Sequence, residues 1–252
     1  MKKMILVVLD GLGNEIAELK MGYMKHLEEG SIARKSNVVA SLPTLSRPLY
    51  ETILTGKQPY EHGIVHNLNR SLSKSKSIFH EVAASGMISA AAAYHWISEL
   101  YLNGDQNSTL DRFHLSGEPP IHYGIFYYED QYPDSHVFMD ASYLLKTYQP
   151  DFMLVHPMNV DDAGHKDGAL SEGYGLAARR VDGILSMALP EWIKAGYEII
   201  VTADHGMSED RGHGGGTPLE RYVPFWYIGT KTKDLPTEQV ALKAFIMNCL
   251  EI

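Results

Sequence analysis

Short runs of apolar residues alternate along this chain with longer segments whose apolar positions recur at helical spacing. The short runs are rich in Val, Ile, Leu, Met and Ala, which is typical of buried strands. They lie at residues 4–9, 37–40, 87–94, 152–155 and 198–201. Helices are expected at residues 14–29, 47–54, 78–84 and 174–189. Continuous apolar strands separated by helices favour an α/β fold, in which helices cover both faces of a mostly parallel sheet.

The length of 252 residues, with 44% hydrophobic content, fits one α/β domain that spans residues 1–252. The pattern loosens between residues 103 and 140, where Pro119 and Pro120 are adjacent and tyrosines are frequent. We expect this segment to form a small cap or insertion beside the functional site.

Charge and cysteine content narrow the classes of function. The net charge of −9 argues against non-specific binding to a nucleic acid polymer or to an anionic membrane. The single cysteine, Cys249, excludes a disulfide framework and a Cys-rich zinc site. No apolar run approaches the roughly 18 residues of a transmembrane helix. We therefore expect a cytoplasmic protein without a membrane partner, and the sequence leaves its oligomeric state open.

Candidate metal ligands follow the ends of the predicted strands. Asp204 and His205 follow the strand at 198–201 within a few residues, and His213 lies in a Gly-rich loop further along the chain. Asp10 ends the first strand. Open α/β sheets bind ligands at the carboxyl ends of their strands, where carboxylate and imidazole groups can hold a divalent cation. Asp10 by itself would more often cap the next turn.

Two further sites complete the pattern. Asp161 and His165 are four residues apart, which places them on one face of a helix. Ser46 lies in a proline-flanked loop ahead of the helix at 47–54, where an isolated serine would more often be an ordinary N-cap. The evidence for chemistry is the order and spacing of all these residues together.

That order resembles the alkaline phosphatase superfamily, and within it the type I nucleotide pyrophosphatase/phosphodiesterase family. Pro43–Ser46 resembles the family's Pro-Thr-x-nucleophile motif, and Leu54-Thr55-Gly56 follows it as in the family. The stretch at 61–67 resembles its His-Gly-Ile motif, and 204–207 its Asp-His-Gly-Met motif. The short spacing from His205 to His213 is also similar to that of ethanolamine-phosphate transferases of the superfamily, which are expected to carry membrane spans.

The resemblance implies a site with two divalent metal ions. Asp161, His165 and His213 would hold one ion. Asp10, Asp204 and His205 would hold the other, with Ser46 bound beside it. Mixed histidine and carboxylate ligands favour Zn²⁺, with manganese and iron as alternatives. Asp162, beside Asp161, is the alternative carboxylate, or a group that supports the ligands from behind.

The implied activity is hydrolysis of a small-molecule phosphate ester through a phosphoserine at Ser46. Two divalent ions can stabilise the attacking and leaving oxygens of an in-line displacement, and metal coordination activates a serine hydroxyl. A phosphodiesterase or nucleotide pyrophosphatase is the first interpretation.

Several departures from the family pattern leave alternatives open. Family diesterases carry Asn three residues after the nucleophile, where this chain has Leu49. Arg47 could contact the phosphate in its place, which would favour a phosphomonoesterase, or it could be a structural arginine. Tyr50 stands where superfamily sulfatases have Arg, which argues against a sulfatase. A non-catalytic relative that binds metal or nucleotide is the remaining alternative.

Overall fold

The computed structural model describes residues 2–103, 112–230 and 234–252. Within these residues the strands form one sheet in the order β2-β8-β7-β1-β6-β3-β5-β4. The strands are β1 (Lys3–Val8), β2 (Arg34–Val39), β3 (Ser89–Tyr94), β4 (Phe113–His114), β5 (Tyr123–Tyr127), β6 (Phe152–Val155), β7 (Tyr197–Thr202) and β8 (Tyr222–Ile228).

The centre of the sheet is parallel. Leu6 of β1 lies opposite Leu154 of β6 on one side and Ile200 of β7 on the other. β8 runs antiparallel to β7 and β2, and β4 runs antiparallel to β5. The central strands are buried on both faces, which explains why their sequences are continuously apolar. The predicted mostly parallel α/β fold is confirmed.

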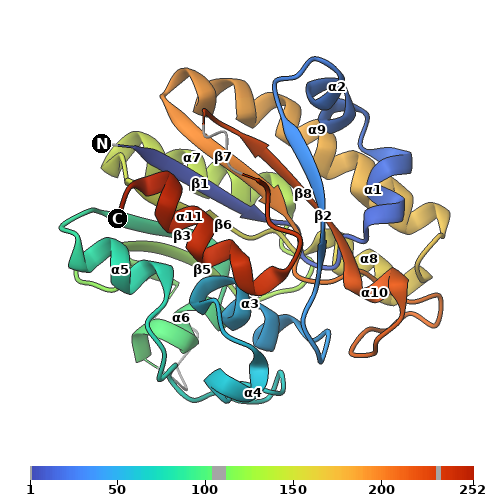
Figure 1. Ribbon diagram of the computed structural model, residues 1–252, viewed down its shortest axis with the longest axis horizontal. Helices are drawn as coiled ribbons and strands as arrows, with labels where there is room; N and C mark the ends of the chain where they lie inside the picture. Colours follow the sequence, from blue (N-terminus) through green and yellow to red (C-terminus); the bar gives the residue numbers. More distant parts are fainter. Residues whose placement is uncertain (1, 104–111, 231–233) are drawn as a thin grey trace.

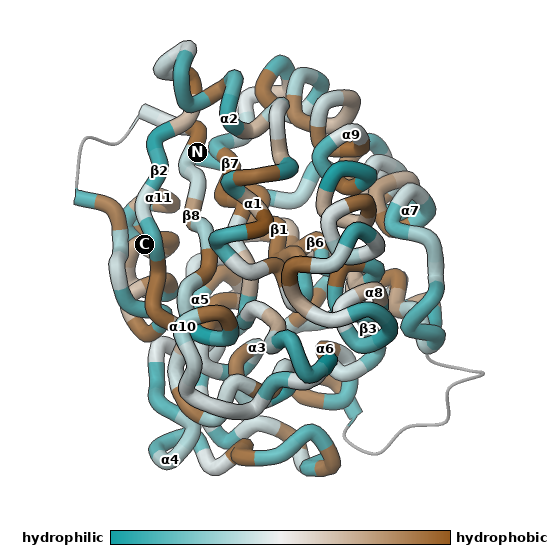
Figure 2. The backbone as a smooth tube through the Cα atoms, turned by 90° about the vertical axis from the view of Figure 1, so that its right-hand side faces the viewer, coloured by the Kyte–Doolittle hydropathy of each residue, from teal (hydrophilic) through white to brown (hydrophobic). Residues whose placement is uncertain are grey.

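Helices cover both faces of the sheet (Figure 1). α11 (Leu242–Leu250) packs against β1 on the near face, beside α3 (Ser46–Thr55) and α5 (Ile78–Ala84). α7 (Asp134–Tyr148) and α9 (Glu172–Lys194) lie on the far face, against β6 and β7 respectively. Figure 2 shows the apolar strands in the interior and the polar segments around them. No helix among the described residues has the length and apolarity to cross a membrane.

The shorter helices connect these layers. They are α1 (Asn14–Lys20), α2 (Gly22–Glu29), α4 (Pro59–His62), α6 (Trp96–Ser98), α8 (Asn159–Asp167) and α10 (Pro218–Arg221). A π-helical turn (Glu99–Asn103) follows α6, and a 3₁₀ turn (Gln239–Ala241) precedes α11.

The single helix expected at residues 14–29 is two helices, α1 and α2, which meet at Met21. The carboxylate of Asp182 on α9 accepts hydrogen bonds from the backbone N–H groups of Tyr23 and Met24. These are first-turn donors of α2, so a tertiary contact stabilises a new helix start that the periodicity alone does not reveal.

The described part of the segment at 103–140, which was predicted as a cap or insertion, contributes strands to the main sheet. This part supplies β4, β5 and the first turns of α7. Residues 104–111 lie outside the described part of the chain. β8 was not predicted from the sequence, although all of its residues except the first are buried.

Candidate active site

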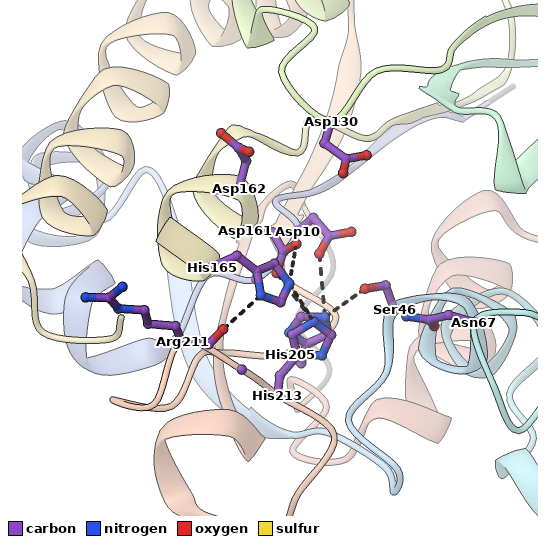
Figure 3. Close-up of polar contacts among 12 residues, drawn as sticks. Asp10, Ser46, Asn67, Asp130, Asp161, Asp162, His165, His205, Arg211 and His213 are labelled. Carbon is purple, nitrogen blue, oxygen red and sulfur yellow. Dashed lines mark hydrogen bonds and ion pairs between the residues drawn. The ribbon is translucent and has the colours of Figure 1, made fainter. Parts of the chain in front are cut away.

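The carboxyl ends of β1, β6 and β7 are neighbours in the sheet, and the predicted ligands meet there (Figure 3). Asp10 follows β1, and Asp204 and His205 follow β7. Asp161 and His165 lie on α8, which follows β6. The other side of the site is formed by Ser46, the first residue of α3, and by His213, in the loop before α10.

His205 lies at the centre of the first group. Its Nε2 atom is 3.5 Å from Asp10 Oδ1, 3.3 Å from Asp204 Oδ2 and 2.9 Å from Ser46 Oγ. Asp10, Asp204 and His205 are fully buried. The nucleophile candidate therefore faces the same atom that the two carboxylates face.

His213 and His165 form the second group with Asp161. His213 Nε2 is 3.7 Å from Asp161 Oδ1, and His165 Nε2 is 3.3 Å from Asp161 Oδ2. The two Nε2 atoms are 3.2 Å apart. His165 is the exposed member and lies at the rim of the site.

Backbone carbonyls determine which ring nitrogen of each histidine carries hydrogen. The Nδ1 atoms of His165, His205 and His213 lie 2.9, 2.8 and 2.7 Å from the carbonyl oxygens of Arg211, Gly206 and Thr44. A carbonyl oxygen can only accept, so each Nδ1 donates and, in the neutral ring, each Nε2 presents a lone pair to the site. This orientation is typical of histidines that ligate metal through Nε2.

The three carboxylates each retain an oxygen without a hydrogen-bond partner. Among the described residues, Asp10 Oδ1, Asp161 Oδ1 and Asp204 Oδ2 are buried polar atoms of this kind. Burying such an atom is unfavourable unless a hydrogen-bond donor or a cation compensates. Three such oxygens beside inward-facing imidazole nitrogens fit divalent metal ions.

The pKa values within the site are driven apart. Burial, and then the charge of Asp10, raise the pKa of Asp204 well above its usual range. Burial would also raise the pKa of Asp10, but the hydrogen bond from His156, electrostatic attraction to His205 and His156, and the hydrogen bond from Tyr50 lower it. Burial, and then His205, lower the pKa of His213 to about 4, whereas the hydrogen bond to Asp161 raises that of His165 to about 9. Such divergence is characteristic of functional sites.

The atoms close enough to share an ion form two groups within the described residues. One is Asp10, Asp204 and His205, the set that the resemblance implied. The other is Asp161, His205 and His213, so that His205 lies in both groups and His165 adjoins the second from the rim. Asp162 is turned away from the centre (Figure 3), and its Oδ2 accepts from Lys166 Nζ at 2.5 Å.

Gly11 allows the strand end and α8 to approach each other. Its φ angle is +70°, and a Cβ atom at this position would lie 2.7 Å from Asp161 Oδ1 and 2.8 Å from Asp161 Cα. The backbone N–H of Gly11 also donates to Asp204 Oδ1 at 3.2 Å. A residue with no side chain thus positions two carboxylates of the site.

Arg47 is fully buried, and both of its Nη atoms have partners while its Nε has no hydrogen-bond partner. Its Nη2 atom pairs with Glu99 at 2.6 Å, its Nη1 donates to the carbonyl of Asn69 at 2.8 Å, and its Cζ lies 4.6 Å from the ring centroid of Trp96. Burial lowers the pKa of Arg47 despite this pairing. These contacts hold the guanidinium in the protein interior.

Sequence reasoning missed Asn67 as a neighbour of the nucleophile. Its side-chain oxygen accepts from the backbone N–H of Arg47 at 3.1 Å, and the residue lies beside Ser46 (Figure 3). Leu49, where family diesterases have Asn, is buried in the protein. The available signal was position, because Asn67 ends the His-Gly-Ile stretch. Tyr50 and His156 were also missed, and both contact Asp10.

The chain is similar to several known proteins. The family model described as type I phosphodiesterase / nucleotide pyrophosphatase matches residues 4–244. Rat ectonucleotide pyrophosphatase/phosphodiesterase family member 3 is 30% identical over 194 residues, which cover 68% of this chain and 20% of that protein. The human GPI ethanolamine phosphate transferase 2 catalytic subunit is 21% identical over 246 residues, which cover 93% of this chain and 24% of that protein. The chain thus spans a fifth to a quarter of the length of these relatives.

Solved structures share the fold. Murine ectonucleotide pyrophosphatase / phosphodiesterase 5 superposes with a TM-score of 0.77 at 14% identity, over 100% of this chain and 95% of that chain. An inactive variant of the same murine protein, in complex with AMP, gives a TM-score of 0.78 at 14% identity, over 100% of this chain and 96% of that chain. A 2-O GAG sulfatase gives 0.71 at 13% identity, over 100% of this chain and 71% of that chain. The predicted place in the alkaline phosphatase superfamily is confirmed.

Proposed function

The chain belongs to the type I phosphodiesterase / nucleotide pyrophosphatase family, and on that premise we propose that it is a metal-dependent hydrolase of phosphoric diesters. The observation that carries this proposal is the position of Ser46 Oγ, 2.9 Å from His205 Nε2 in a site where three carboxylates retain unpartnered oxygens. Such a site combines a nucleophile with the means to hold two cations.

Ser46 would act as the nucleophile. Its hydroxyl donates to His205 Nε2, because the Nδ1 hydrogen of His205 is directed to the carbonyl of Gly206. Ser46 also begins α3, where the helix dipole favours an anionic oxygen. Attack would form the Oγ–P bond and break the bond to the leaving alcohol, and water would then cleave the phosphoserine.

The remaining side chains hold the cations and orient the ester. Asp10, Asp204 and His205 would hold one ion, and Asp161, His213 and His165 the other, with Zn²⁺ as the proposed metal. When bound, two such ions would favour the serine alkoxide and stabilise charge on the phosphoryl oxygens. The side-chain oxygen of Asn67 accepts from Arg47 N–H, which fixes this residue beside Ser46.

The monoesterase alternative depends on a free guanidinium at Arg47. The contacts of Arg47 with Glu99, Asn69 and Trp96 hold its guanidinium in the protein interior. This position supports a phosphodiesterase over a phosphomonoesterase. A solved relative holds AMP, so nucleotide diesters are among the candidate substrates.

The test compares the hydrolysis of bis(p-nitrophenyl) phosphate and p-nitrophenyl phosphate by protein loaded with Zn²⁺ or Mn²⁺. We expect a preference for the diester, and we expect Ser46→Ala to abolish turnover while the metal content and the melting temperature stay at wild-type values. A monoester preference would favour the phosphomonoesterase alternative. Turnover by Ser46→Ala at the wild-type rate would refute the phosphoserine route, and a metal-loaded wild type inactive on both esters would favour a binding-only relative.

A further inference from the structure

Asp10 has two different carboxylate oxygens. Oδ2 accepts hydrogen bonds from the Tyr50 hydroxyl and from His156 Nε2, the latter at 3.0 Å. Oδ1 has no hydrogen-bond partner and faces His205 Nε2 at 3.5 Å. All four side chains are buried.

The hydrogen on His156 is placed by the backbone of β3. The N–H of Tyr94, the last residue of β3, points at His156 Nδ1 at 3.4 Å. Since a backbone N–H can only donate, Nδ1 accepts, and the ring hydrogen of neutral His156 is on Nε2. His156 therefore donates to Asp10 Oδ2. The sheet fixes this direction because β3 pairs with β6, whose end carries His156, and β6 pairs with β1, whose end carries Asp10.

Tyr50 donates to the same oxygen of Asp10. It lies on α3, one turn after Ser46, and its ring packs edge-on against His156 with centroids 4.5 Å apart. Tyr50 and His156 therefore pack against each other and both donate to Asp10.

We propose that His156 and Tyr50 are positioning residues that saturate Asp10 Oδ2, so that Asp10 binds its metal ion through Oδ1 alone. This inference rests on the proposed metal-dependent function. Groups that hydrogen-bond to metal ligands fix the ligand's orientation, and their loss weakens metal binding by about 10–100-fold. Both residues would act through Asp10 and not on the ester itself.

The test measures metal binding and not activity. Apoprotein is titrated with Zn²⁺ in competition with a chromogenic chelator, which resolves the affinities of the two binding events. We expect His156→Phe to weaken one event by about 10–100-fold and to leave the other within about twofold. We expect His156→Gln, whose amide can still donate, to recover most of the loss. Tyr50→Phe, which changes only the hydroxyl, should weaken the same event.

His122→Phe is the matched control. His122 Nδ1 accepts from the N–H of Ser89, the first residue of β3, as His156 Nδ1 accepts from that of Tyr94, the last. The control removes an equivalent contact away from the metal ligands and should change neither binding event. The visible spectrum of Co²⁺-loaded protein gives a second readout, since His156→Phe should change the bands of one ion only.

The outcomes separate this inference from the proposed function. If the wild type binds no Zn²⁺, the two-metal function fails and the inference fails with it. If the wild type binds two ions and folded His156→Phe and Tyr50→Phe bind both with unchanged affinity, only the positioning role is refuted. An equal loss of both ions with a lower melting temperature of the apoprotein would show a merely structural role and also refute it.

Discussion

His165 and His213 approach each other through their Nε2 atoms at 3.2 Å, while each Nδ1 faces a backbone carbonyl. In the neutral tautomers that these carbonyls select, two lone pairs face each other beside Asp161. That arrangement is unfavourable by itself and becomes favourable when a proton or a divalent cation lies between the rings. The hydrogen bond to Asp161, which favours a proton on the His165 ring, raises the pKa of His165 to about 9.

Metal addition should therefore stabilise the folded protein, and part of the increase in the free energy of unfolding should depend on His213. A ligand that binds only the folded state at 100 times its Kd adds about 2.7 kcal/mol to the free energy of unfolding. We expect Zn²⁺ to raise the melting temperature of apoprotein, and His213→Ala to lose a large share of that rise. The measurement is a thermal melt at increasing Zn²⁺ concentrations.

The control for this melt is His26→Ala, which removes an exposed histidine on α2. It should keep the full Zn²⁺ response. The same rise in His213→Ala as in the wild type would contradict the assignment of His213 as a ligand.

Gly11→Ala should damage the site more than its backbone strain alone explains. The φ angle of +70° is unfavourable for alanine, and the added Cβ would lie 2.7 Å from Asp161 Oδ1. We expect a loss of stability of at least about 1 kcal/mol and weaker Zn²⁺ binding, because Asp161 has to move. Chemical denaturation and chelator competition measure the two effects.

Gly86→Ala separates strain from displacement. Gly86 has a φ angle of +72°, and nothing lies within 4 Å of a Cβ placed there. It should show the loss of stability without the loss of metal affinity. If both variants bind Zn²⁺ with the wild-type affinity, the close approach of Gly11 to Asp161 is not needed for metal binding.

The sequence was sufficient for the parts of the fold that depend on local pattern. β1, β6 and β7 were predicted because strands buried on both faces are continuously apolar. The ligand positions followed from motifs placed at the ends of these strands. The break at Met21 was not predictable in this way, since the acceptor of the α2 N–H groups is Asp182, far along the chain.

The same limit applies within the site. Whether Arg47 faces the phosphate or the interior depends on Glu99, 52 residues later, and on the carbonyl of Asn69. The contact of His156 with Asp10 exists only because β6 and β1 are neighbours in the sheet. Side-chain direction and strand order are tertiary properties, and one sequence without its sheet order does not specify them.

Asp134 should make the stability of the protein depend on pH. Burial raises its pKa to about 7, against an ordinary value of 3.8. Between these values the folded state retains a proton that the unfolded state has lost, so stability falls as the pH rises from about 4 to 7. A shift of about three units corresponds to at most about 4 kcal/mol.

Asp134→Asn tests this dependence because it removes the titration and keeps an oxygen that can accept from Asn159 N–H, now 3.0 Å from Asp134 Oδ1. In the presence of a chelator, we expect this variant to melt above the wild type at pH 8 and near it at pH 4. Glu29→Gln, at an exposed position on α2, should keep the wild-type profile. Parallel curves for Asp134→Asn and the wild type would refute the buried titration.

The ion pair between Arg47 and Glu99 should act on stability and not on substrate choice. Both side chains are buried, and loss of one partner leaves the other charge uncompensated, which costs about 3–5 kcal/mol. We expect Arg47→Met to lower the free energy of unfolding by about this amount, and Arg47→Met combined with Glu99→Gln to recover part of it. Arg47→Met keeps the backbone N–H that holds Asn67, so the ratio of kcat/KM between the two ester classes should stay at its wild-type value. The measurement is kcat/KM for the aryl diester and the aryl monoester beside chemical denaturation, and a selective loss of monoester hydrolysis would instead show that the guanidinium reaches the phosphate.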